Sequence, residues 1–307
     1  MKITVLCGGV GAARLLAGLA AVTDPAQITA ICNVGDDLQW HGLHVSPDID
    51  TVLYTLAGLE GDQGWGIRGD TTTTLEALRA LEGDAWFTIG DRDLATHLLR
   101  AARLGAGETL AEATATLARA HGVSTTVLPV TNDRHPTIVQ TPRGDLPFQV
   151  YFVQRRAADP VTGFLFPGVN SARPAPGVLE AIEGCDALVF APSNPFVSIE
   201  PILAVSGVRD AVRRTRARRV AVSPIVGGAA MKGPAADMMR ALGHEVSALG
   251  VARLYAGLVD RFVVDTVDAA CLPEVRALGM EAVAFDTMMI GDAGRARVAA
   301  ALLEVLA

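Results

Sequence analysis

Apolar segments of two kinds alternate along the chain. Short runs such as Ile3–Cys7 and 28–34 have the length of strands, whereas 12–22 and 94–104 repeat apolar residues at helical spacing. This alternation predicts an α/β fold: a Rossmann-like, mostly parallel sheet with helices on both faces. The remaining expected helices are 49–59, 71–81, 110–120, 235–242, 251–258 and 292–306, and the remaining strands are 86–89, 187–191, 219–223, 262–264 and 282–285.

The middle of the chain has a different pattern. Residues 125–130, 137–140 and 148–153 are rich in β-formers, and Pro142 and Gly144 mark a hairpin turn between the second and third of them. We therefore expect one α/β domain over residues 1–307, with a β-rich, antiparallel insertion or subdomain at 125–175.

Composition narrows the class of protein. The chain has 307 residues and is 50% hydrophobic, but its apolar run at 12–22 contains Arg14 and is shorter than the roughly 20 residues of a membrane span. With 26 basic and 33 acidic residues the net charge is −7, which argues against nucleic acid as a partner and leaves an anionic small molecule open. The four cysteines form no CxxC pair, so a reducing cytoplasm is the expected location.

A glycine-rich loop follows the first strand and opens a helix. Gly8, Gly9 and Gly11 would let the backbone approach an anion, the helix N-terminus offers unpaired amides, and Arg14 adds positive charge. The loop lacks the ending of a Walker A motif and is not a full GxGxxG, so a tight turn without a ligand stays open.

Carboxylates follow the second strand and begin the next helix. Asp36 and Asp37 could hold Mg²⁺, bind a ribose or form a solvated turn. Asp48 is an N-cap candidate. Asp50 lies in the first helical turn, where the helix dipole stabilises a carboxylate, but the same carboxylate could equally accept hydrogen bonds from a donor-rich ligand.

Polar loops also follow the later strands. Asp91 and Arg92 begin a helix in Gly90-Asp91-Arg92-Asp93, where they could hold a ligand or form surface ion pairs, and His97 on that helix is interpreted as structural or supporting. Ser193 and Asn194 follow one strand, and Gly227 and Gly228, with Lys232 nearby, follow another. Since all these loops fall at the carboxyl edge of the predicted sheet, we expect them to form one site. His41 and His44 have metal-ligand spacing without a third ligand, and no motif for covalent catalysis is present.

Taken in order, these loops resemble the CofD/FbiA family, the 2-phospho-L-lactate transferases of coenzyme F420 biosynthesis. The similarity covers residues 1 to about 260, and its most specific parts are Gly-Asp-Arg-Asp-Leu-Ala-Thr-His at 90–97 and Ala-Pro-Ser-Asn-Pro at 191–195. The other matching segments are 7–15, 33–37, 47–56, 68–71, 198–203 and 223–233.

The resemblance implies a cytoplasmic, Mg²⁺-dependent enzyme that is commonly a homodimer. It would transfer a phospho-acid unit, enolpyruvyl or lactyl, from a guanylylated donor to the ribityl hydroxyl of the deazaflavin Fo, releasing GMP. By this resemblance Asp50 and Arg92 contact Fo, with Asp91 and His97 beside them, and Asp50 is also our catalytic candidate. The resemblance places Asp36, together with Asp37, at Mg²⁺. Gly8, Gly9, Gly11, Arg14, Ser193, Asn194, Gly227, Gly228 and Lys232 would hold the phosphates and guanylyl group.

Two departures from the family pattern and two alternatives remain. Ala12 and Ala13 stand where many relatives have a further glycine, and position 44 varies among relatives, which weakens a metal role for His41 and His44. The alternatives are a nucleotide-sugar or NAD-dependent Rossmann enzyme and a non-catalytic, nucleotide-binding regulator of the same fold.

Overall fold

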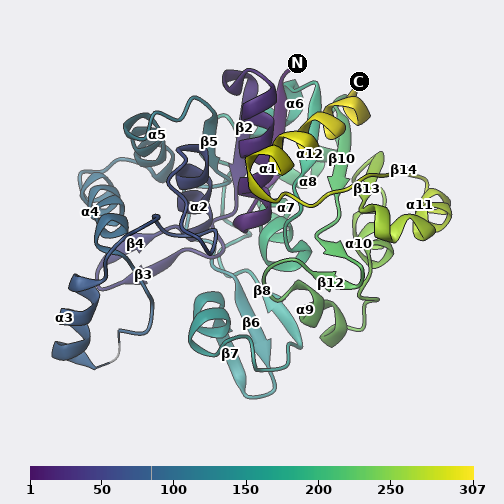
Figure 1. Ribbon diagram of the computed structural model, residues 1–307. Helices are drawn as coiled ribbons and strands as arrows, with labels where there is room; N and C mark the ends of the chain where they lie inside the picture. The colour runs from purple at the N-terminus through teal and green to yellow at the C-terminus, as the bar shows by residue number, and fades with distance from the viewer. Residues whose placement is uncertain (84) are drawn as a thin grey trace.

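The main sheet has seven parallel strands in the order β14-β13-β10-β9-β1-β2-β5. A computed structural model describes residues 1–83 and 85–307 (Figure 1). All five residues of β1 are buried, as expected for a strand covered on both faces. The strands are β1 (Ile3–Cys7), β2 (Ile28–Cys32), β5 (Thr126–Pro129), β9 (Ala187–Phe190), β10 (Arg218–Val222), β13 (Arg261–Val264) and β14 (Glu281–Ala284).

Helices cover both faces of this sheet. On one face α1, α2 and α12 pack together, and on the other α6 packs against α8 (Figure 1). The helices are α1 (Gly9–Val22), α2 (Pro47–Leu56), α3 (Thr73–Glu82), α4 (Asp91–Gly105), α5 (Leu110–Ala120), α6 (Val178–Gly184), α7 (Glu200–Ala204), α8 (Val208–Arg214), α9 (Ala235–Ala241), α10 (Ala248–Tyr255), α11 (Leu272–Ala277) and α12 (Gly291–Leu306), with shorter helical turns η1 (Pro25–Gln27), η3 (Pro195–Ile199) and η4 (Thr266–Cys271). The predicted α/β class is confirmed. No helix in the described ranges combines the length and hydropathy needed to cross a bilayer.

The β-rich middle segment differs from the prediction at its start. Residues 125–130 contain β5, which pairs in parallel with β2 at the edge of the main sheet instead of joining an antiparallel insertion. The reason is the connection: helices α2 to α5 lie between β2 and β5, and a crossover of that kind returns the chain parallel to its starting strand.

A separate three-stranded antiparallel sheet follows, in the order β7-β6-β8. It consists of β6 (Ile138–Thr141), β7 (Gly144–Pro147) and β8 (Gly163–Leu165). The expected strand at 148–153 is wrong, because this segment enters the helical turn η2 (Val150–Gln154). There Phe148 and Phe152, four residues apart, stack with ring centroids 5.5 Å apart, a contact that helical spacing allows. The division of the chain into a domain and an insertion stays a prediction.

Two hairpins were not predicted. Strands β3 (Leu38–Trp40) and β4 (Leu43–Val45) are joined by His41 and Gly42, both with positive φ, and β11 (Ile225–Val226) pairs with β12 (Ala229–Ala230). The expected strand at 86–89 is irregular. Its Ile89 packs instead in a small core with Trp40, Val45 and Leu75.

Candidate active site

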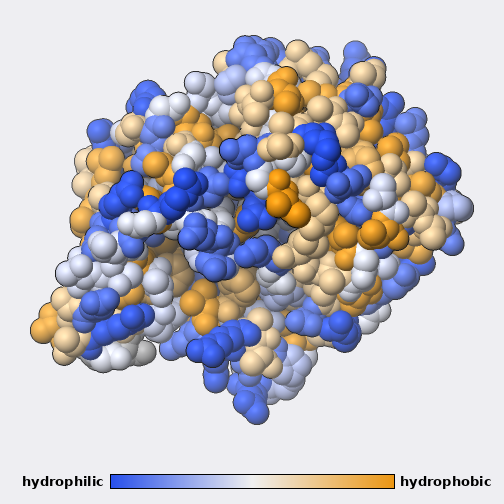
Figure 2. All heavy atoms as spheres, in the orientation of Figure 1, coloured by the Kyte–Doolittle hydropathy of each residue, from blue (hydrophilic) through white to orange (hydrophobic). Residues whose placement is uncertain are grey.

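A cavity of about 690 Å³ opens at the carboxyl edge of the main sheet, between the loops that follow β1, β2, β9 and β10. The chain crosses from β1 to β2 in one direction and from β9 to β10 in the other, so the cavity lies where the strand order reverses. Open α/β sheets bind ligands at such points. Figure 2 shows this face of the molecule hollowed near its middle, where hydrophilic and hydrophobic residues meet.

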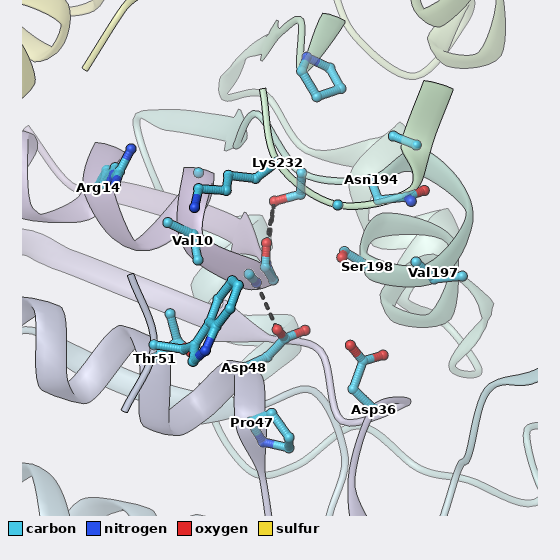
Figure 3. A pocket seen from close by; sticks show the side chains of 18 of the residues that line it. Val10, Arg14, Asp36, Pro47, Asp48, Thr51, Asn194, Val197, Ser198 and Lys232 are labelled. Carbon is cyan, nitrogen blue, oxygen red and sulfur yellow. Dashed lines mark hydrogen bonds between the residues drawn. The ribbon is translucent and has the colours of Figure 1, made fainter. Parts of the chain in front are cut away.

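Two buried carboxylates, Asp36 and Asp48, lie side by side on the cavity wall (Figure 3). The Asn33 amide donates to both, at 3.0 and 2.8 Å. Burial, and for Asp36 the neighbouring Asp48, raises both pKa values, that of Asp48 to about 6. The expected N-cap role of Asp48 is wrong: α2 starts at Pro47 with Ser46 as its N-cap, and Asp48, one residue into the helix, accepts the Gly9 amide at 2.7 Å.

Two glycines of the loop, Gly8 and Gly11, pack too closely for a side chain. A Cβ at Gly8 would lie 2.6 Å from the Asp48 carboxylate, and one at Gly11 would lie 2.4 Å from the Pro192 carbonyl oxygen. The amides of Gly8 and Gly9 already donate to Ser193 and Asp48. This leaves the next amides of the first turn of α1, those of Val10 and Gly11, for a ligand, because a helix cannot pair them itself.

Two cations, Arg14 and Lys232, line the same cavity (Figure 3). Arg14 makes no ion pair with any residue that the structure describes, and its Nε is buried without a partner. Burial, together with nearby Arg295, lowers its pKa. Lys232 donates to the Gln63 carbonyl at 3.2 Å and lies over the Trp65 ring. An anionic ligand would supply the partner that Arg14 lacks.

Asp50 reaches the cavity from α2, but an ion pair holds it in place. Arg100, a fully buried residue of α4, donates from Nη1 to one Asp50 oxygen at 3.1 Å and from Nη2 to the other. Burial alone would lower the Arg100 pKa, but the carboxylate of Asp50 outweighs it and the pKa is raised. The pair is therefore a buried, two-point contact between opposite charges.

Three further cavity residues surround this pair. His97 Nδ1 lies 3.3 Å from Arg100 Nη1 and 3.7 Å from an Asp50 oxygen, while its Nε2 lies 3.2 Å from Asp93 Oδ1. Tyr54 donates its hydroxyl to Asp93 Oδ1 at 2.6 Å. Burial, with Asp50 and Asp93 nearby, raises the Tyr54 pKa, so this hydroxyl keeps its proton.

The Gly-Asp-Arg-Asp segment has a structural role that the sequence did not indicate. Asp70, just before α3, accepts the amides of Arg92 and Asp93 at the start of α4, and Asp91 in return accepts those of Thr73 and Thr74 at the start of α3. A Cβ at Gly90 would lie 2.2 Å from the Asp70 carboxylate. These reciprocal contacts satisfy backbone amides of both helix starts and fix the position of α4.

Most of the predicted site residues meet in the cavity. Those in its wall are Gly8, Gly9, Gly11, Arg14, Asp36, Asp50, His97, Ser193, Asn194 and Lys232, and those outside it are Asp37, Asp91, Arg92, Gly227 and Gly228.

Four of these five residues make other hydrogen bonds, and those of Asp91 are described above. Asp37 accepts bonds from Ser46 and pairs with His44. Arg92 donates to the Arg68 carbonyl, and Gly227 donates to Asp268 from the turn between β11 and β12.

The acidic pair suits Mg²⁺. This ion keeps several waters and binds proteins through one or two carboxylates together with substrate phosphates. Asp36 and Asp48 supply two such carboxylates beside the helix N-terminus, and among the described residues neither accepts a hydrogen bond from a Lys or Arg side chain. Within residues 1–83 and 85–307 no group of three or more His, Cys, Asp or Glu side chains is placed to hold a metal, and His44 contacts Asp37.

Comparison with known proteins gives one family over nearly the whole chain. The family described as 2-phospho-L-lactate transferase CofD matches residues 3–303. The chain belongs to the CofD family. A Streptomyces griseus relative named phosphoenolpyruvate transferase is 43% identical, over 99% of this chain and 98% of its own. A Methanothermobacter thermautotrophicus relative named 2-phospho-L-lactate transferase is 42% identical, over 94% of both chains. This CofD protein is therefore an enzyme of the transferase class.

The fold of this CofD protein also occurs among solved structures. A Bacillus halodurans protein matches with a TM-score of 0.64 over 98% of this chain and 99% of its own. Its sequence identity is 22%, so the likeness concerns the fold alone.

Several residues of the site were missed in the sequence. Arg100, Asp93 and Tyr54 lie on helices, where their partners are set by packing. One signal was present, because Asp93, His97 and Arg100 are spaced i, i+4, i+7 and share one face of α4. Lys232 was predicted to bind phosphate, but no sequence pattern indicated its contact with Trp65, which is distant in the chain.

Proposed function

We propose that this CofD protein transfers a phospho-acid unit, enolpyruvyl or lactyl, from a guanylylated diphosphate donor to the ribityl hydroxyl of the deazaflavin Fo, releasing GMP. The relatives named for phosphoenolpyruvate and for 2-phospho-L-lactate match almost equally, at 43% and 42%, so the donor acid is a question for experiment. The observation that carries the proposal is a cavity with paired carboxylates, Asp36 and Asp48, and with Arg14 and Lys232 in the same wall.

The charges fit a diphosphate. Arg14 and Lys232 would attract the phosphate oxygens, and the amides of Val10 and Gly11 would bind them at the N-terminus of α1. Asp36 and Asp48 repel a phosphate unless a cation lies between, so we propose that these two carboxylates hold Mg²⁺. When bound, Mg²⁺ supplies neutralisation of the charge that develops on the transferred group.

The residues of the chain supply positioning more than covalent chemistry. Transfer of a phosphoryl-type group needs an attacking hydroxyl in line with the leaving oxygen and little else from the protein. We propose that Asp50, fixed by Arg100, contacts Fo from α2, on the same helix as Asp48. Asp91 and Arg92 are left out of this contact because neither lines the cavity.

The test is mass spectrometry of the product formed from Fo and each of the two guanylylated donors. We expect one donor to give GMP together with an Fo mass increased by the phospho-acid, and we expect EDTA to abolish the reaction. Asp36→Asn should lower turnover strongly, whereas Asp24→Asn, an exposed residue after α1 at the opposite end of that helix, should not. Turnover that survives EDTA would contradict the proposed Mg²⁺ dependence. Binding of Fo without formation of product would favour a nucleotide-binding regulator. Light scattering would test the expected homodimer.

A further inference from the structure

Three acid–base side chains, Asp50, Asp93 and His97, lie at the end of the cavity where we propose that Fo binds, which we call the acceptor end. They are exposed to the cavity to different extents. The Asp93 side chain is 14% exposed, whereas those of Asp50 and His97 are 5% and 2% exposed. All three line the cavity. A hydroxyl group that enters it therefore meets the Asp93 carboxylate more readily than the other two.

Asp50 is engaged on both oxygens. Arg100 Nη1 and Nη2 each donate to a different oxygen of this carboxylate, and Arg100 has no exposure to water. Breaking such a buried contact leaves an unpaired charge in the protein interior. Asp50 is therefore suited to fixing the geometry of the site more than to accepting a proton.

Arg100 also restricts His97. An arginine is always protonated and has no acceptor, so the 3.3 Å contact between Arg100 Nη1 and His97 Nδ1 requires Nδ1 to be the unprotonated nitrogen. The proton of the neutral ring is then on Nε2, which lies 3.2 Å from Asp93 Oδ1. In this tautomer Nε2 carries the proton and has no lone pair to accept another, although its 3.2 Å approach to Asp93 Oδ1 does not form a hydrogen bond.

Asp93 is held as an acceptor with one oxygen to spare. Its Oδ1 receives the Tyr54 hydroxyl and faces His97 Nε2, and its backbone amide is fixed by Asp70 at 2.9 Å. Its Oδ2 makes no hydrogen bond to any residue in the described part of the chain.

We propose that Asp93 is the catalytic residue that accepts the proton of the attacking hydroxyl, with Arg100 as a positioning residue that excludes Asp50 and His97 from that task. The inference rests on the proposed function. The acceptor oxygen forms a bond to the phosphorus that carries the acid, the bond from that phosphorus to the bridging oxygen breaks, and GMP leaves with that oxygen and its electron pair. The hydroxyl proton passes to Asp93 Oδ2 and then to water.

The first experiment separates catalysis from binding in Asp93→Asn. The amide keeps an acceptor for Tyr54 but cannot take a proton, so we expect kcat to fall about 100-fold, the scale of general base catalysis. The Kd for Fo, from fluorescence titration, should stay within threefold. Turnover within fivefold of wild type overturns the proposal, and so does a loss confined to Kd. If wild type forms no product with either donor, the proposed function fails instead.

The second experiment is chemical rescue, which a purely structural role would not show. Asp93→Ala leaves space for a small carboxylate, so added formate should raise its turnover at least tenfold, in proportion to concentration. Formate should not change the turnover of wild type or Asp24→Asn, and it should not rescue Asp93→Asn, whose amide fills the space. Absence of rescue in folded Asp93→Ala, or equal rescue of Asp93→Asn, overturns the assignment. Circular dichroism and a thermal melt establish that each variant is folded.

Discussion

The ion pair between Arg100 and Asp50 supports a sharp prediction about stability. Substitution Arg100→Met keeps most of the volume of the side chain but removes every donor. The Asp50 carboxylate then loses both hydrogen bonds in a place where only 5% of its side chain is exposed. His97 Nδ1 and the His44 carbonyl oxygen lose their contacts with Nη1 as well.

The expected magnitude follows from burial. Removing one partner of a buried pair costs about 3–5 kcal/mol, because the remaining charge is left without compensation. A domain is commonly stable by about 5–15 kcal/mol, so this loss removes a large fraction of the total. The melting temperature should fall by roughly 10 °C, at about 2–4 °C for each kcal/mol in a large domain.

The assay is urea denaturation at pH 7, followed by circular dichroism. Arg214→Met is a matched control, because Arg214 pairs with Glu183 at the surface with both side chains about half exposed or more, and it should cost less than about 1 kcal/mol. The double variant Arg100→Met/Asp50→Leu should recover at least half of the loss, since an apolar pair replaces the unpaired charge. Equal losses for Arg100→Met and Arg214→Met, or a double variant as unstable as the single one, would refute the reasoning.

Three further predictions follow from single contacts. Gly11→Ala should lower stability by about 1–3 kcal/mol, because its Cβ would lie 2.4 Å from the Pro192 carbonyl oxygen. The control is Gly105→Ala, whose Cβ would meet nothing within 4 Å and which should be neutral or stabilising. Thermal melts of the two variants test this difference. The folded pKa of Asp48, about 6, exceeds the ordinary value near 4, so in EDTA the folded state binds an extra proton between these values. This group should therefore lower the free energy of unfolding by about 2 kcal/mol as pH rises from 4 to 7. Asp36, whose pKa is also raised, adds to this fall, so Asp48→Asn should reduce the fall and leave a remainder, and an unchanged pH dependence would contradict the assignment. Asp91→Ala should lower the melting temperature by uncapping α3 without changing the Kd for Fo, and a tenfold weaker Kd would return Asp91 to the acceptor site.

The fold followed from local patterns wherever a strand is buried on both faces. The segments 3–7, 187–191 and 219–223 are nearly continuous apolar runs, and the structure has strands there within one residue. The segment 148–153 contains aromatic and β-branched residues too, but these pack along a helical turn, where Phe148 stacks on Phe152. Short apolar runs of this kind fit both the strand repeat and the helix repeat, so tertiary packing decides which of the two structures forms.

The glycine loop and the loop after β9 could be placed in the site because parallel topology brings strand ends to one edge. The two carboxylates that we propose to hold Mg²⁺ could not be assigned in the same way. Asp36 and Asp37 are adjacent in sequence, but Asp37 turns to His44 of the unpredicted hairpin, and the structure pairs Asp36 with Asp48 through Asn33. Adjacent carboxylates after a strand thus point to different partners.

The helix residues of the site depend on the position of α4. Asp93, His97 and Arg100 share one face of that helix, and that face meets Asp50 and Tyr54 only because α4 starts where the Asp70 carboxylate binds its first amides. Gly90 is required there, since any Cβ would overlap Asp70. Gly90→Ala should therefore displace Asp93 and Arg100 together and reduce turnover more than Asp91→Ala, although both residues stand in the same short motif. If the two variants lose activity equally, the position of α4 is not what builds the acceptor end of the site.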